Sequence, residues 1–273
     1  MASSLLTAGE AARRLGVSPI TIQRWVDAGA LQARRTAGGH RRIPMSDIRK
    51  RLMALRSEAE ARRLASWLKG LLTGQVGPVA TLMRTARSVH GSWAGVADEV
   101  SRVVVELGDL WQAGDCSVFE EHMATEALRR AAAACAAATR RRGKAPSALL
   151  TTAPGERHTL GLSLAELVLA ERGWRSVWIG EGPPVEEFPR MVDRLAADLC
   201  VVSASGLVEP KSLHSLQRSL VRSAGGSRLV LAGRARWRPS ASAYRCLTFE
   251  DFDRLLVTLS EKTIIRTSLR QRG

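Results

Sequence analysis

No stretch of this sequence is apolar over the roughly 20 consecutive residues that a membrane-spanning helix needs. The first residues, Met-Ala-Ser-Ser-Leu-Leu-Thr, also lack the basic segment, apolar core and cleavage site of a secretory signal. We therefore expect a chain that does not contact membranes and that is located in the cytoplasm.

Cysteine is scarce and widely spaced. None of the four cysteines has the C-x-x-C spacing used for metal binding or redox chemistry, and no secretory context favours disulfides. Free cysteines are usually buried as small apolar residues. The sequence therefore predicts four buried, reduced thiols, at Cys116, Cys135, Cys200 and Cys246.

Acidic residues are few beside the basic ones. The 273 residues include 41 Lys+Arg and 26 Asp+Glu, a net charge of +15. Residues 1–56 alone contain 11 Lys+Arg and three Asp+Glu, so about half of the excess lies in a fifth of the chain. A basic segment of this kind indicates an anionic partner, and double-stranded DNA is the first candidate. The expected location is then the nucleoid.

Residues 1–58 have the pattern of a winged helix-turn-helix domain. Thr7 and Glu10 form a capping box that predicts a helix beginning near Ala8. Ser18-Pro19 is an N-cap followed by proline at the first helical position, which predicts a second helix over 20–28. Residues 31–43 alternate like a β-ribbon that turns at Gly38-Gly39, and Ser46 is expected to cap a further helix that ends near Leu72.

The second helix and the ribbon supply candidate DNA contacts. Ile22, Trp25 and Val26 share one stripe of the helix and are expected in the core, which leaves the other stripe for base edges. A solvated basic face is the alternative, and the adjacent helix-turn-helix argues against it. The predicted contacts are Thr21, Gln23 and Arg24 on the helix, and Arg34, Arg35, His40, Arg41 and Arg42 on the wing, where phosphates or a minor groove would bind.

Two further domains are expected. Residues 59–143 have apolar residues at helical spacing, with glycines at 74, 77, 91, 95 and 114 between the helices, which predicts a helical bundle. Residues 147–273 contain strand-like runs that alternate with helical stretches, which predicts a Rossmann-like parallel α/β domain. The fold class is therefore multidomain α and α/β, with strands predicted at 148–153, 176–180, 199–204 and 229–233.

One candidate site lies at a junction between two predicted helices. Trp111 ends one helix, Gly114-Asp115 forms the turn, and a capping box from Ser117 to Glu120 starts the next helix. Glu121 and His122 then fall in its first turns, so an indole, a carboxylate and an imidazole converge. Taken alone, such a trio is more typical of a core tryptophan beside a solvated pair.

A second candidate site follows a buried strand. Glu156 and His158 lie in the loop at the carboxyl end of the strand, where open α/β sheets bind ligands. The carboxylate of Glu156 can bind one imidazole nitrogen of His158 and leave the other for a metal. Gly161 permits close approach of a bulky planar ligand. Neither candidate segment has the spacing of a hydrolytic triad or of a protein-caged zinc, so a metal held in a macrocycle fits better.

Three parts of the sequence resemble known families. The helix-turn-helix, Trp25 and the Gly-Gly-His-Arg-Arg wing resemble the DNA-binding domain of the MerR superfamily. Glu-x-His-x-x-Gly at 156–161 resembles the Asp-x-His-x-x-Gly signature of cobalamin-binding domains. Trp-x9-Glu-His from Trp111 resembles the helical cap of the B12-dependent photoreceptor repressors of the CarH and LitR type, which have the same three domains in the same order.

The resemblance implies a light-sensing transcriptional regulator, most simply a repressor, that binds adenosylcobalamin. It implies a homo-oligomer, dimer or tetramer, on an operator, with photolysis of the cofactor changing oligomeric state and DNA affinity. His158 would be the lower axial ligand of cobalt, beside Glu156 and Gly161. The upper face would be covered by Trp111, Val118, Glu121 and His122, and the nucleotide tail would lie near Ser203, Ser205, Ala232 and Gly233.

The sequence also departs from that pattern. Glu156 replaces aspartate, and Ala232-Gly233 replaces a glycine pair and is followed by Arg234, Arg236 and Trp237. Gln112 stands where such photoreceptors can carry a histidine, which excludes a bis-histidine light product through that position.

Two alternatives remain. One is a regulator of the same build that binds another tetrapyrrole, haem or bilin, or no cofactor. The other is an enzyme of the corrinoid methyltransferase or mutase kind, against which the basic N-terminal domain argues. We therefore expect no enzymatic activity.

Overall fold

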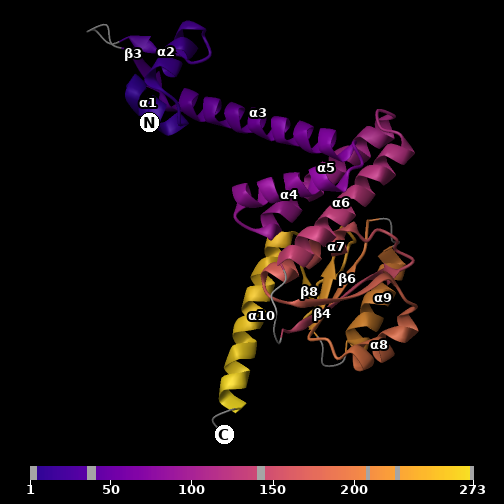
Figure 1. The fold of residues 1–273 in the computed structure, drawn as a ribbon. Helices are drawn as coiled ribbons and strands as arrows, with labels where there is room; N and C mark the ends of the chain where they lie inside the picture. The colour runs from indigo at the N-terminus through magenta and orange to yellow at the C-terminus, as the bar shows by residue number, and fades with distance from the viewer. Residues whose placement is uncertain (1–4, 36–40, 140–144, 207–209, 225–227, 271–273) are drawn as a thin grey trace. The chain divides into compact units, whose positions relative to one another are not determined.

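The computed structural model describes residues 5–35, 41–139, 145–206, 210–224 and 228–270. The chain forms two compact units, residues 1–66 and residues 67–273 (Figure 1). The long helix α3, Met45–Leu71, carries the chain from the first unit to the second. The division into three domains, with a helical bundle separate from the α/β part, stays a prediction.

Two short helices and a tight turn form the first unit. α1 spans Ala8–Leu15 and α2 spans Pro19–Asp27. Thr7 caps α1 as predicted: its hydroxyl accepts the amide of Glu10, and the Glu10 carboxylate accepts the amide of Thr7 at 2.8 Å. Gly16 ends α1 with φ of 66°, a conformation that favours glycine. The predicted helix-turn-helix is therefore present.

An antiparallel sheet completes the first unit. Its strands lie in the order β1-β3-β2, and β2 pairs with β3 as the predicted ribbon. The tip of the ribbon, 36–40, which includes the expected Gly38-Gly39 turn and His40, lies outside the described residues. α3 begins at Met45, one residue before the predicted Ser46 cap. The strands are β1 (Leu5–Leu6), β2 (Arg34–Arg35) and β3 (Arg41–Pro44).

The apolar stripe of α2 packs into the core of the first unit, as predicted. Ile22 is fully buried, while Trp25 and Val26 are partly buried against the same cluster. The guanidinium of Arg51 lies 4.4 Å from the centre of the Trp25 ring, which adds a cation–π contact between α3 and α2. The opposite stripe of α2 is left exposed.

Three helices open the second unit: α4 (Val76–His90), α5 (Trp93–Ala113) and α6 (Val118–Thr139). Gly91 and Gly114 end α4 and α5 with positive φ, as predicted for helix breaks. Gly77 and Gly95, also predicted as breaks, lie instead inside the first turns of α4 and α5. A helix tolerates glycine at a modest cost when the flanking residues pack well.

A parallel five-stranded sheet forms the centre of the second unit. The order is β5-β4-β6-β7-β8, so the chain reverses its direction of winding between β4 and β6. This reversal creates a switch point at the carboxyl ends of β4 and β6, the usual ligand position in open α/β sheets. The two-residue β8 was not predicted. The strands are β4 (Ser147–Pro154), β5 (Arg175–Gly182), β6 (Leu199–Ser203), β7 (Arg228–Ala232) and β8 (Tyr244–Arg245).

Helices cover both faces of this sheet. α7 (Leu160–Glu171) and α10 (Phe249–Arg270) pack on one face, which we call the α7 face. A short 3-10 helix (Val185–Glu187) leads into α8 (Phe188–Leu195), which packs with α9 (Pro210–Ser223) on the other side, the α9 face. Figure 1 shows α8–α9 and α10 on opposite sides of the strands.

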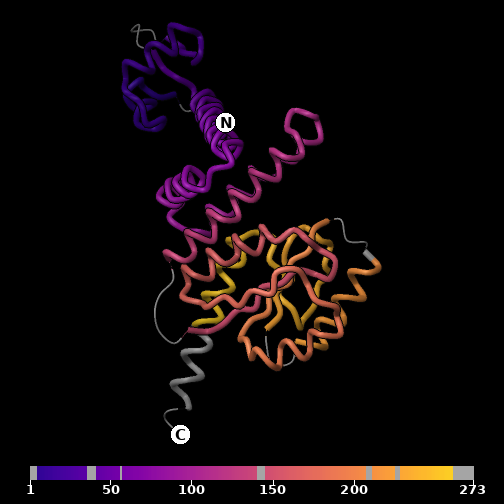
Figure 2. Tube along the Cα trace, turned by 45° about the vertical axis from the view of Figure 1, so that its right-hand side comes forward, coloured from indigo at the N-terminus to yellow at the C-terminus, as the bar shows by residue number. Residues whose placement is uncertain are grey.

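In Figures 1 and 2 the turn between α5 and α6 extends beyond the α/β layers. All four cysteines are buried and unbridged, as predicted. Among the described residues, no helix has the length and apolar character needed to span a bilayer.

One glycine tests the fit of β5 against β4. Gly182→Ala is expected to lower the free energy of unfolding by roughly 2 kcal/mol, a typical cost of overpacking. A Cβ there would lie 2.1 Å from the carbonyl oxygen of Thr152, which is backbone and must shift. Gly108→Ala, at an open helical position in α5, is the control and should raise stability by up to about 1 kcal/mol. Urea denaturation of both variants measures the difference, and similar values for the two would contradict the close packing.

Candidate functional site

A buried carboxylate fixes the loop after β4. Glu156 is 5% exposed. Its Oε1 accepts the backbone amide of His158 at 2.9 Å and contacts the ring Nδ1 of His158 at 2.5 Å. Its Oε2 accepts the backbone amide of Ser205 at 2.7 Å, from the loop after β6. One side chain therefore joins the two loops on either side of the switch point.

The same contacts set the charge of Glu156 and the state of His158. Burial raises the pKa of Glu156, but hydrogen bonds from Ser205 and His158 outweigh it and lower the pKa to about 2. An ionised carboxylate holds a proton on Nδ1 of His158 and leaves the lone pair on Nε2. The His158 side chain is 71% exposed, so this nitrogen is accessible. The arrangement suits an imidazole that gives one bond to a metal.

A threonine that the sequence did not reveal supports this loop. Thr152 is fully buried in β4, and its hydroxyl donates to the carbonyl oxygen of Glu156 at 2.6 Å. The hydroxyl oxygen of Thr152 also accepts the backbone amide of Gly182 at 2.9 Å, from the end of β5. Thr152 thus ties the loop to the neighbouring strand. No motif marks this position, because the contact depends on strand pairing.

Small residues line the carboxyl ends of β6 and β7 on the α7 face. Ser203 and Ala232 are register partners, and Ala232 packs against the core beneath α7. A Cβ on Gly161 would lie 3.7 Å from Oγ of Ser203, so α7 passes close to these strands. Gly233 has φ of 85°, and a Cβ there would lie 2.2 Å from the carbonyl oxygen of Ala204. The side chains at these strand ends are therefore small, and larger ones would contact α7 or the neighbouring loop.

The bulky residues after Gly233 do not fill that space. Trp237 is buried in the cluster on the α9 face, and its Nε1 donates to the carbonyl oxygen of Ala232 at 2.8 Å. Arg234 and Arg236 are exposed. The departure from a glycine pair therefore leaves the small side chains of Ser203 and Ala232 on the α7 face, which is compatible with a bound corrinoid.

The α5–α6 junction has the predicted caps and exposes apolar side chains. Gly114 donates its amide to Trp111 and Leu110 at the end of α5. The Ser117 amide donates to the Glu120 carboxylate at 2.8 Å, which starts α6. Trp111 is 47% exposed. Val118 is exposed as well, and so are two further apolar side chains on α6 that were not predicted, Phe119 and Met123.

The Glu121–His122 pair lies on the first turns of α6. Oε2 of Glu121 contacts Nδ1 of His122 at 2.6 Å, and Oε1 accepts the hydroxyl of Thr125 at 2.8 Å. The His122 side chain is 75% exposed. Glu121 therefore orients an accessible imidazole, as Glu156 does for His158.

Helix packing relates the two candidate sites. α6 and α5 both pack against α7, and α7 begins directly after the His158 loop. Glu156, His158, Gly161, Ser203 and Ser205 form one connected group at the switch point. In the described part of the chain, the side-chain hydrogen bonds of Glu121 and His122 stay within α6. The structure thus packs the two helices of the Trp111 junction against α7, the helix that follows the His158 loop.

The predicted DNA contacts lie on the outer surface of the first unit. Gln23 and Arg24 are exposed on α2, and Thr21 is half-buried with its hydroxyl 2.9 Å from that of Ser18. Arg34 and Arg35 on β2 face Arg42 and Arg41 on β3. Arg41 also donates to Asp27 at 2.8 Å, which fixes the ribbon to the end of α2. His40 lies outside the described residues.

Comparisons with known proteins agree with both halves of this organisation. The helix-turn-helix domain family matches residues 5–56, and the B12 binding domain family matches residues 94–136, which cover α5 and most of α6. The monomethylamine corrinoid protein of Methanosarcina barkeri has a similar fold, with a TM-score of 0.53, 14% identity, and coverage of 71% of this chain and 96% of that one. At this identity the likeness shows the fold alone.

The family and relative matches together define a class: a DNA-binding transcriptional regulator with a B12-binding sensor. Within that class, the chain is similar to the HTH-type transcriptional repressor CarH of Myxococcus xanthus, with 26% identity over 248 residues, covering 78% of this chain and 82% of the relative. The predicted fold class and the resemblance to CarH-type regulators are therefore confirmed.

The role of Glu156 is testable in protein without cofactor. Because the pKa of Glu156 is about 2 in the folded chain, below its ordinary 4.5, its contribution to stability is complete above pH 4.5 and is lost as pH falls towards 2. Glu156→Gln should lower the free energy of unfolding at pH 7 by at most about 3 kcal/mol, with a smaller difference at pH 3. Urea denaturation at both pH values measures this. Glu186→Gln, at an exposed position, is the control, and a difference that does not change with pH would contradict the assignment.

Proposed function

We propose that this protein is a light-sensing repressor that binds adenosylcobalamin through His158. The single observation that carries the proposal is the exposed imidazole of His158, with Nδ1 held by the buried, ionised Glu156 and Nε2 left for cobalt. The B12 binding domain match and the small residues on the α7 face support it. When bound, adenosylcobalamin supplies a cobalt–carbon bond that light breaks.

The residues of the chain have distinct parts in this proposal. Glu156 and Thr152 hold the His158 loop, so that the imidazole is oriented before the ligand arrives. Gly161, Ser203, Ser205, Ala232 and Gly233 leave room for the nucleotide tail at the ends of β4, β6 and β7. Trp111 and Val118, whose apolar surface is exposed, would cover the bound corrinoid with the Glu121–His122 pair and exclude water from it.

DNA binding follows from the first unit. Thr21, Gln23 and Arg24 read base edges, and the wing residues Arg34, Arg35, His40, Arg41 and Arg42 bind phosphates. One such module has a modest reach, so we propose that a dimer or tetramer binds paired sites. Loss of the assembly on illumination then weakens binding through lost avidity, which is worth about 10²-fold or more.

We also propose three domains, at residues 1–58, 59–143 and 147–273.

The direct test of the sensor is a visible absorption spectrum. Protein loaded in the dark with adenosylcobalamin and desalted should retain the corrinoid, with a His-ligated spectrum that changes on illumination. His158→Ala should lose this spectrum, because the axial nitrogen is removed, while His214→Ala, on the α9 face, should keep it. Equal retention by His158→Ala would contradict axial ligation, and a haem-type spectrum of the purified protein would favour another tetrapyrrole.

The output is tested separately by light scattering and operator binding. The loaded protein should have a larger mass in the dark than after illumination, and its affinity for an operator should fall by 10²-fold or more in the light. Protein without cofactor, given the same light, is the control. Unchanged mass and affinity in loaded protein would contradict the light-dependent assembly and leave corrinoid binding intact.

A further inference from the structure

The second unit carries a basic region that neither DNA recognition by the first unit nor corrinoid binding uses. Residues 67–273 contain 28 Lys+Arg and 21 Asp+Glu, an excess of seven. Residues 210–249 contain eight Lys+Arg and no Asp+Glu, which is more than this whole excess. The positive charge of the second unit is therefore concentrated in α9, β7, β8 and their connections, where it creates a local attraction for anions.

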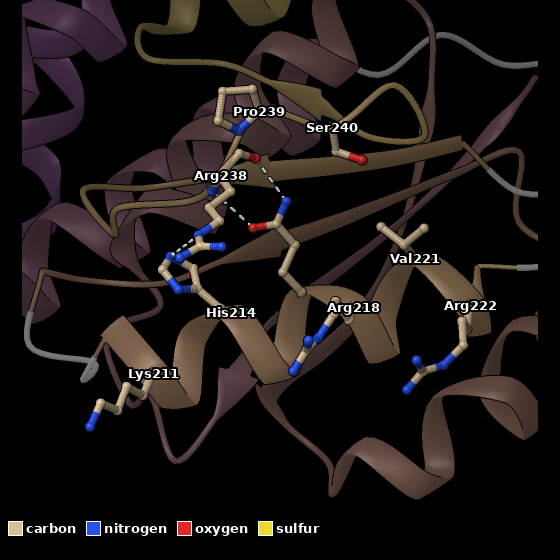
Figure 3. A pocket seen from close by; sticks show the side chains of 9 residues that line it. Lys211, His214, Arg218, Val221, Arg222, Arg238, Pro239 and Ser240 are labelled. Atoms are coloured by element: carbon tan, nitrogen blue, oxygen red, sulfur yellow. Dashed lines mark hydrogen bonds between the residues drawn. The ribbon is translucent and has the colours of Figure 1, made fainter.

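A groove in this region gathers the charge. It has a volume of about 640 Å³ and lies between α9 and residues 238–240 (Figure 3). Lys211, His214, Arg218 and Arg222 line it from α9, and Arg238 lines it from the opposite segment. Among the residues that the structure describes, no carboxylate lines the groove. Figure 3 shows Lys211, Arg218 and Arg222 projecting from the same side of α9.

Hydrogen bonds, two of them made by the buried Gln217, join the two walls of the groove. Gln217 is 6% exposed; its Nε2 donates to the carbonyl oxygen of Arg238 at 2.8 Å, and its Oε1 accepts the amide of Arg238 at 2.9 Å. Nε of Arg238 donates to Nε2 of His214 at 3.0 Å, so the imidazole acts as acceptor and orients the guanidinium. Figure 3 shows these bonds as dashed lines. The groove is thus a fixed feature of the fold rather than a chance alignment of long side chains.

The spacing of the cations favours an extended polyanion. Lys211, Arg218 and Arg222 are separated by seven and four residues, so they extend over about 16 Å of helix. A single phosphate reaches only part of that length, whereas a DNA strand presents a phosphate at each rise of about 3.4 Å. In the described ranges, the His214 ring is the one aromatic side chain that lines the groove, so these residues lack the stacking surface that single strands require.

We propose that this groove binds the phosphate backbone of duplex DNA, as a second contact independent of sequence. Guanidinium groups suit the task because they give two parallel hydrogen bonds to a phosphate. The sensor unit then contacts DNA directly, in addition to the helix-turn-helix. This contact does not depend on corrinoid binding or on light.

The test is the salt dependence of binding by the full-length protein, without corrinoid, to a duplex of mixed sequence. Arg218→Gln/Arg222→Gln removes two phosphate contacts, so the slope of log affinity against log salt should become shallower by about 1.8, and affinity near 0.1 M salt should fall by roughly 50-fold. The matched control is Arg102→Gln/Arg194→Gln, which removes two exposed arginines on α5 and α8 and should change the slope little.

Equal changes in the two double variants would overturn the proposal, because overall charge would then explain them. Unchanged duplex binding in Arg218→Gln/Arg222→Gln would also overturn it. If that double variant lost binding of inorganic phosphate instead, the groove would be a site for small anions, and if it lost binding of an acidic peptide, a protein site. Failure of corrinoid sensing appears in the absorption spectrum and leaves this result unaffected.

Discussion

The proposed sensor depends on the buried carboxylate of Glu156. It accepts the backbone amide of His158, in the loop after β4, and contacts the His158 ring. It also accepts the backbone amide of Ser205, which lies 49 residues further along the chain in the loop after β6. A buried carboxylate without partners would cost free energy, so the hydrogen bonds from both loops stabilise the fold around Glu156. The same bonds that stabilise the loops therefore orient the imidazole, and ligand binding needs little reorganisation.

Glu156 has one methylene more than the aspartate of related signatures. The longer side chain fits because it is buried between the two loops. The carboxylate reaches across the switch point between β4 and β6 and takes a partner from each side. The second departure, the bulky residues after Gly233, is explained by the face of the sheet on which Trp237 lies. Trp237 packs on the α9 face, so its size has no effect on the small residues Ser203 and Ala232 on the α7 face. Both departures thus leave the His158 loop and the small residues of the α7 face in place.

Local signals predicted the parts of the fold that local interactions determine. The caps at Thr7 and Ser117 lie within four residues of their partners, and four strands were found because each is an apolar run. β8 has two residues and no such run. Gly95 lies in the first turn of α5, where its amide donates to the N-cap hydroxyl of Ser92. Thr152 and the groove at Arg238 could not be predicted, since each depends on segments at least 21 residues apart that only strand pairing or helix packing brings together.

Positive charge on both units would let both bind DNA phosphates. Phosphate contacts contribute affinity without sequence information, and base contacts contribute specificity, so a basic groove on the sensor would add strength to whatever sequence the helix-turn-helix selects. Two contacts on one chain act together only when the chain and the assembly let both reach the same duplex. The contributions of the two contacts to affinity then multiply, so a change in the sensor that alters the assembly affects both factors. The concentration of positive charge in residues 210–249 would in this way make DNA release more sensitive to the state of the sensor than one winged helix alone allows.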